Sequence, residues 1–254
     1  MFVKQLTLSV LGFSILLFWY LTYNVNCFLL IIPMILSILL AKSTYEYMIV
    51  KKVCSANCFF KRDSLLYSLL TKKVFIILIS MLSGMILSFI LLLNVLNFTI
   101  LDWTLLFIDI LLIIWLYNKF DKINFLNSNI KFSVLKHSVS IVSAILLSTV
   151  FLIANLYQKP PHYIQNSLSS TVHEASKQVH SNCKYIDSVT GISIEISSVK
   201  WWIILKMSDN IKNTYLKATM WILYLLGNYL MLFAFARLIS EMIYLTPKEN
   251  TKDE

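Results

Sequence analysis

The sequence predicts an all-α polytopic membrane protein, a bundle of about six transmembrane helices with a small extracytoplasmic cap. Three observations predict it: the composition, the length of the apolar runs and the placement of the lysines. The chain of 254 residues is 58% hydrophobic and only 14% charged, and its mean hydropathy is +0.73. An ordinary soluble domain is about one quarter charged. The composition therefore excludes a soluble enzyme, a disordered protein and a nucleic-acid-binding domain, in spite of a net charge of +9.

Six apolar runs are long enough, or nearly long enough, to cross a membrane as helices. A helical span needs about 20 mostly apolar residues to cross about 30 Å of hydrocarbon. The second run is the shortest and contains Pro33, whereas the sixth is long enough to tilt or to extend past the bilayer. The runs are Leu6–Tyr23, Cys27–Ala41, Val74–Val95, Ile100–Tyr117, His137–Tyr157 and Ala218–Tyr244.

The distribution of basic residues between these runs predicts the orientation of the spans. Segment 42–73 carries seven basic and two acidic residues, and segment 118–136 carries four basic residues and one acidic residue. The short connections Asn24–Asn26 and Leu96–Thr99 carry no charge. Because basic loops stay in the cytoplasm, we expect both basic loops and both termini to be cytoplasmic, in a bacterial inner membrane.

The alternation of loops divides the chain into three parts. Residues 1–157 hold the first five spans and the two basic loops. Residues 158–217 form an extracytoplasmic segment, and residues 218–254 hold the sixth span and a cytoplasmic tail. The lipid bilayer is therefore the main environment of the protein.

The extracytoplasmic segment is predicted to form a small cap. Its sequence predicts a polar helix over Tyr163–Asn182 and a short strand at Ile192–Ile196, where isoleucines alternate with polar residues. The stretch Val199–Leu205 contains two tryptophans and predicts an interfacial anchor. About 60 residues are too few for an independent core, so we expect the cap to lean on the spans below it.

Asp109 is the residue whose chemistry is hardest to reconcile with lipid. It lies midway between Trp103 and Trp115, about 9 Å along the helix from either aromatic residue. A carboxylate at this depth costs several kcal/mol unless it is paired, protonated or hydrated. Asn228, near the middle of the sixth run, is the predicted partner. Asp109 is then either an ion or proton site or a protonated donor that bridges two helices.

Two residues at the inner end of the sixth run form a predicted interfacial pair. Arg237 and Glu241 are one helical turn apart, which is the spacing of an i,i+4 ion pair. We expect the Arg237 side chain to extend toward the headgroups.

Two rows of small residues predict close helix packing. Residues of this kind, repeated every four positions, let helix backbones approach each other within a bundle or between protomers, so a homo-oligomer is one expected state. The rows are Ser80, Gly84 and Ser88 in the third run and Ser140, Ala144 and Ser148 in the fifth.

Histidines and cysteines of the outer segment give only weak site signals. His173, His180 and Cys183 fall near one face of a helix, but their spacing matches no established zinc pattern, so we expect no metal and no cofactor. Cys27 and Cys183 are both predicted on the outer side, where an oxidising compartment could support a disulfide.

The function predicted from these features is a non-catalytic multi-pass membrane component of a multi-protein system: a scaffold, an immunity protein or a membrane effector of an antiviral defence cassette. Nucleotide-binding, hydrolase and haem motifs are missing from the sequence. Four glycines and four prolines favour rigid helices. Loop 42–73 is the predicted docking surface for a protein partner.

The alternative is a permease or channel subunit. In topology alone, the six spans with both ends inside and a structured segment between spans five and six resemble the small ABC-2-type permeases. The resemblance implies dependence on a separate cytosolic ATPase that docks on cytoplasmic helices. It implies a transport function without naming the transported species.

Overall fold

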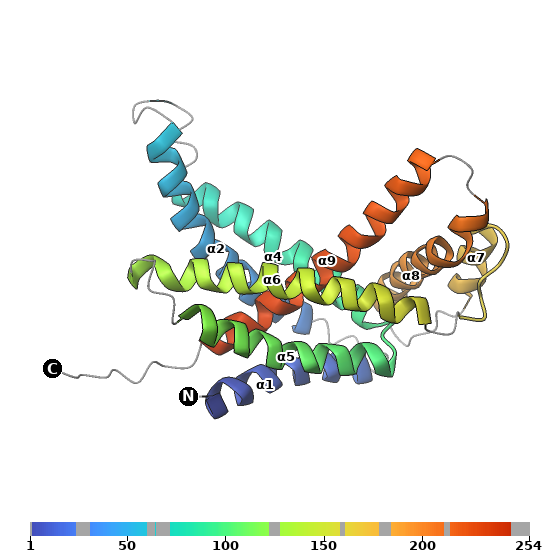
Figure 1. The fold of residues 1–254 in the computed structure, drawn as a ribbon, viewed down its shortest axis with the longest axis horizontal. Coiled ribbons are helices and arrows are strands. Elements are labelled where there is room, and N and C mark those ends of the chain that lie inside the picture. The colour runs from blue at the N-terminus through green and yellow to red at the C-terminus, as the bar shows by residue number, and fades with distance from the viewer. Residues whose placement is uncertain are drawn as a thin grey trace.

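The structure of the chain is a computed structural model in which regular structure is entirely helical over the residues it describes. The helices pack into one bundle (Figure 1). They are α1 (Phe2–Thr22), α2 (Ile31–Phe59), α4 (Lys73–Val95), α5 (Ile100–Asp121), α6 (Ser128–Tyr157), α7 (Leu168–Ser176), α8 (Lys184–Asn210) and α9 (Thr214–Tyr244). The described residues are 2–23, 31–59, 64, 72–121, 128–157, 161–177, 184–210 and 214–244.

Five helices of the described chain are long and apolar enough to cross a membrane, which indicates a multi-pass helical membrane protein. The second predicted run is not among them. Its helix, α2, has an apolar part that ends at Ala41, and the charged residues Lys42 and Glu46 follow within the same helix. Residues 24–30 lie outside the described chain. The five candidate spans are Phe2–Thr22, Lys73–Val95, Ile100–Phe120, Ser133–Asn155 and Thr214–Tyr244.

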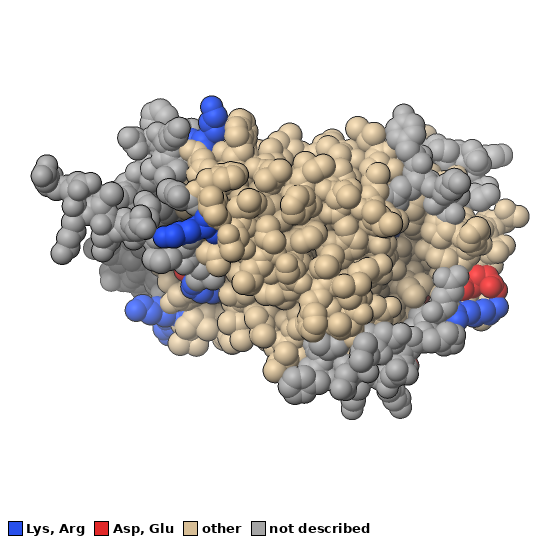
Figure 2. All heavy atoms as spheres, turned by 90° about the horizontal axis from the view of Figure 1, so that it is seen from below, with Lys and Arg blue, Asp and Glu red and all other residues tan. Residues whose placement is uncertain are grey.

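The long helices alternate in direction along the bundle. At one end of the molecule in Figure 1 lie the first residues of α1, α4 and α6 and the last residues of α2, α5 and α9. Helices α7 and α8 lie at the other end. Charged side chains on the face shown in Figure 2 are confined to the two ends, with a broad uncharged band between them. Large apolar side chains on the outside of the spans, such as Leu78, Leu82 and Ile108, are exposed. This pattern fits helices that face lipid.

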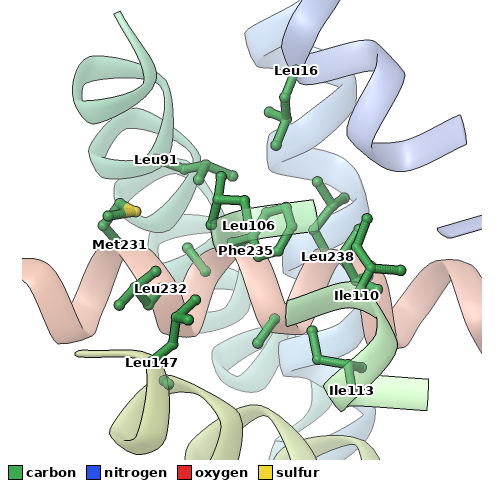
Figure 3. Packing of buried hydrophobic residues seen from close by; sticks show 14 of the residues in the cluster. Leu16, Leu91, Leu106, Ile110, Ile113, Leu147, Met231, Leu232, Phe235 and Leu238 are labelled. Carbon is green, nitrogen blue, oxygen red and sulfur yellow. The ribbon is translucent and has the colours of Figure 1, made fainter. Parts of the chain in front are cut away.

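Helix α9 is the centre of the bundle. Its second half is packed by α1, α2, α4, α5 and α6, so Leu232, Phe235 and Ile239 are fully buried. Figure 3 shows leucines and isoleucines of the surrounding helices, among them Leu106 and Ile110, beside Phe235 and Leu238 of α9. The polar residues of α9 are therefore surrounded by protein, where polar groups need partners.

The predicted cap segment differs in secondary structure from the sequence analysis. The predicted polar helix over Tyr163–Asn182 is shorter in the described chain, where α7 covers nine residues. The predicted strand at Ile192–Ile196 is wrong, because those residues lie inside the continuous helix α8. Ile192 and Ile196 of that alternation are exposed, and a different row of positions on α8 is buried. That row includes Ile186, Thr190 and Ser193.

Candidate functional site

Polar and charged side chains of three helices meet toward the end of the bundle at which α9 terminates. Lys136, Arg237 and Glu241 are buried there, whereas Lys42 and Glu46 are partly exposed. We call this group the charged cluster. Its members lie on α2, α6 and α9, three helices that are distant in sequence and packed against one another. The charged cluster consists of Lys42, Ser43, Glu46, Lys136, His137, Arg237 and Glu241.

Lys136 lies at the centre of the charged cluster and is only 2% exposed. Its Nζ donates to Glu241 Oε2 at 2.8 Å and also to the Glu46 carboxylate, and it lies 4.2 Å from the centre of the Tyr244 ring. Glu241 is fully buried, and its second oxygen, Oε1, lies 3.0 Å from Lys42 Nζ. One carboxylate of α9 thus binds lysines of α6 and α2 together.

Arg237 makes the second set of contacts in the charged cluster. Its Nε donates to Ser43 Oγ at 3.1 Å, and its Nη2 donates to the Ser43 carbonyl at 2.8 Å. Its Nη1 lies 2.9 Å from His137 Nδ1. A guanidinium can only donate, so His137 Nδ1 accepts and the ring proton lies on Nε2. The His137 ring stacks on Tyr47 with the ring centres 3.7 Å apart.

This arrangement differs from the predicted interfacial pair. Arg237 is 3% exposed and does not extend toward lipid headgroups. The side chains of Arg237 and Glu241 form their hydrogen bonds with other helices instead of with each other. The cluster holds three cations, Lys42, Lys136 and Arg237, against the carboxylates of Glu46 and Glu241. Removing one member of a buried ion pair typically costs about 3–5 kcal/mol, because its partner is left buried and unpaired. The charged cluster therefore fixes α2, α6 and α9 relative to one another.

Asp109 lies in the bundle interior, as its position in the sequence indicates, but with a different partner. It is 1% exposed, and its Oδ1 accepts a hydrogen bond from Ser143 Oγ at 2.5 Å. The bond joins α5 to α6. Within the described chain, Asp109 Oδ2 has no hydrogen-bond partner. The predicted contact with Asn228 is not formed, since that side chain is bound elsewhere.

Asn228 binds α8 rather than α5. Its Oδ1 accepts from Nζ of Lys200, a residue of α8, at 3.2 Å. Lys200 also donates to Asn94 Oδ1, at the far end of α4. The same region includes a direct contact of α4 with α8, in which Asn97 Nδ2 donates to the Ser193 carbonyl at 3.2 Å. These bonds attach α8 to the spans, which fits the expectation that the segment leans on them.

The first predicted row of small residues lies against α2. A Cβ at Gly84 would lie 2.6 Å from the backbone N of Ala41 and 2.6 Å from the carbonyl O of Ser37, so the two backbones are in contact there. On either side, Ser88 donates to a backbone carbonyl of α2 at 3.2 Å and Ser80 donates to a methionine sulfur of α2 at 3.7 Å. The row therefore packs within one chain.

The second row behaves differently along its length. Ser140 and Ala144 are fully buried, and Ser140 Oγ lies 3.4 Å from Ser240 Oγ of α9. Ser148 is only partly buried and donates to the Ile145 carbonyl of its own helix at 2.9 Å. Ser140 thus faces α9, and Ala144 is buried in the core of the bundle.

The histidine and cysteine predictions fall mostly outside the described residues. His173 lies in α7, whereas His180, Cys183 and Cys27 are outside, so neither the predicted metal set nor the disulfide is described. Within the ranges that the structure covers, no group of three or more His, Cys, Asp or Glu side chains could hold a metal ion.

Comparison with known proteins gives no relative. No family model matches the chain, and no curated protein or solved structure matches it. The assignment of function therefore depends on the geometry of the chain itself.

Lys136 and Lys200 are missed by sequence reasoning, because Lys136 falls in the predicted loop 118–136 and Lys200 falls in the predicted interfacial anchor Val199–Leu205. A signal for Lys136 exists in the sequence: Lys136, Ser140 and Ser143 recur at helical spacing and form a polar stripe entering an apolar run. Such a stripe indicates a polar partner on another helix. Lys200 offers no comparable signal.

Proposed function

We propose that the protein is a non-catalytic multi-pass scaffold of a bacterial inner membrane that presents its cytoplasmic loop 42–73 to a protein partner. The observation that carries the proposal is the charged cluster. Lys42 and Glu46, at the start of that segment, are held by Lys136 and Glu241 of the bundle. The part of α2 that leads into the loop is thus held against α6 and α9, as a rigid docking surface requires.

The ionisable groups of the charged cluster support a structural role. Their hydrogen bonds and ion pairs run between helices, and each carboxylate lies beside at least one lysine. Buried polar groups that are satisfied in this way fix helix positions. A catalytic group, by contrast, must reach a substrate.

The proposed topology adds α2 as a sixth span. Its 29 residues are long enough to cross a bilayer, with the charged cluster near its cytoplasmic side. The grouping of helix ends in Figure 1 supports this arrangement, because all the helix ends next to the basic loops lie at one end of the bundle. In this topology both termini are cytoplasmic and α7 and α8 form the extracytoplasmic cap.

A permease or channel subunit is the second candidate. The observation that favours it is the presence of fully or nearly fully buried ionisable residues inside candidate spans, among them Asp109, Arg237 and Glu241. In membrane proteins such residues often mark ion or substrate paths. A permease of this kind would bind a cytosolic ATPase at the same loop.

Affinity purification in mild detergent after crosslinking in intact cells tests the proposal. We expect a cytosolic partner that crosslinks to loop 42–73 and is lost in the variant Lys51→Glu, which reverses an exposed charge of α2. The matched control, Lys177→Glu, reverses an exposed charge near α7 and should retain the partner. The scaffold role is contradicted if both variants retain the partner, or if the wild-type chain purifies with no partner. If the partner is an ATPase, the permease is favoured over the scaffold.

A further inference from the structure

A cavity of about 70 Å³ lies where α4, α5, α6, α8 and α9 meet. We call it the Lys200 pocket. Asn228 precedes Arg237 by nine residues, about 13 Å along α9, so the pocket is distinct from the charged cluster. The volume suits a group of a few non-hydrogen atoms. The polar residues lining it include Asn94, Asp102, Asn155, Lys200, Tyr224 and Asn228.

The pocket presents unused hydrogen-bond donors. The Lys200 ammonium has three N–H groups, and it donates to the neutral amide oxygens of Asn94 and Asn228. Asn228 is 4% exposed, and its Nδ2, beside the Tyr224 hydroxyl, makes no hydrogen bond of acceptable geometry within the described chain. A buried donor without an acceptor costs about 1–3 kcal/mol, so an acceptor in the pocket is favourable.

Asp102 is the acidic group that lines the same pocket. Its Oδ2 accepts from the backbone N–H and from the hydroxyl of Thr99, both at 2.8 Å, and so caps the first turn of α5. Asp102 therefore places its charge at a helix terminus, where negative charge is favourable, and the same charge acts on the Lys200 ammonium across the pocket.

We propose that the Lys200 pocket binds the carboxylate of a small organic acid, held between the Lys200 ammonium and the Asn228 amide N–H. Two donors that lie side by side match the two oxygens of a carboxylate. The remaining lining includes the apolar side chains of Phe98, Phe151 and Met231, which would receive a short alkyl group. This inference goes beyond the scaffold role, because it assigns the chain a small-molecule site.

Equilibrium dialysis of radiolabelled acetate against the full chain in mild detergent tests the proposal. We expect saturable binding that propionate displaces and that chloride, at equal ionic strength, does not. Asn228→Asp is the sharpest variant, since it is nearly isosteric and places a carboxylate beside Lys200. It should weaken acetate binding at least tenfold. Lys200→Met should abolish binding, and Lys177→Met, a surface control, should leave it unchanged.

The outcomes are distinguishable from those of the partner experiment, because acetate binding does not require a partner. Absence of saturable acetate binding to the wild-type chain overturns the proposal. Equal binding to Asn228→Asp and wild type also overturns it, as does equal displacement by chloride, which would indicate a halide site. Circular dichroism of each variant establishes that its helices are retained.

Discussion

Replacing Gly84 by alanine should destabilise the bundle by forcing α2 and α4 apart. The new Cβ would lie 2.6 Å from the Ala41 backbone N and from the Ser37 carbonyl O. Both atoms belong to the backbone of α2, so they cannot move aside as a flexible side chain would. The contact can be relieved only by a shift of one helix against the other.

The expected loss follows from three effects. Carbon and its neighbours prefer separations of about 3.5–4.0 Å, so the helices must separate by about 1 Å, which forfeits a quarter to a half of the dispersion energy of nearby contacts. Overpacking of this kind costs about 1–3 kcal/mol. The higher helix propensity of alanine relative to glycine offsets this cost by about 1 kcal/mol. Because both clashes are with backbone, we expect a net loss of about 2 kcal/mol in the free energy of unfolding.

Unfolding by sodium dodecyl sulfate in mixed micelles, followed by far-ultraviolet circular dichroism, measures the effect. Gly191 provides the matched control, because a Cβ there meets nothing within 4 Å. Gly191→Ala should gain about 0.5–1 kcal/mol from helix propensity alone. If Gly84→Ala unfolds at the same detergent fraction as Gly191→Ala, or at a higher one, then the close approach of α2 and α4 is refuted.

Two further predictions concern charged residues. Glu241→Gln should lower the free energy of unfolding by about 3–5 kcal/mol, because it removes a buried carboxylate that Lys136 binds at 2.8 Å; the same unfolding assay checks this, and a loss below that of Gly84→Ala would contradict it. Acetate binding should weaken as pH rises from 7 to 9, since burial lowers the pKa of Lys200 from 10.5 to about 8 and only the ammonium attracts an anion. Asp102 and Tyr224 face the same pocket, so the dialysis is repeated with Asp102→Asn and Tyr224→Phe; a transition that moves with either variant argues against Lys200.

The sequence predicts the helical membrane class well, because hydropathy over 20 residues depends on local composition alone. Five of the six predicted runs overlap the candidate spans of the structure. The close packing at the row around Gly84 could also be predicted from the sequence, since small residues repeated every four positions in an apolar helix usually mark a helix–helix contact. The partner of that row, α2, could not be predicted, because nothing in the row specifies which helix it meets.

The charged cluster shows where sequence reasoning stops. Lys136 counts as a loop residue by hydropathy, yet it is buried because Glu241, 105 residues later, neutralises it. Long-range pairing of this kind reverses the local preference of a charged residue. The predicted strand at Ile192–Ile196 fails for a related reason: five residues of alternation are too short to distinguish a strand from one face of a helix.

The orientation of the chain in the membrane is the claim on which the scaffold, the cap and the partner loop all depend. Paired fusions of green fluorescent protein and alkaline phosphatase, placed after Ser64 and after His173, test it most directly. We expect fluorescence only from the Ser64 position and phosphatase activity only from the His173 position. Fluorescence of a fusion at His173 would place that segment in the cytosol and contradict the account.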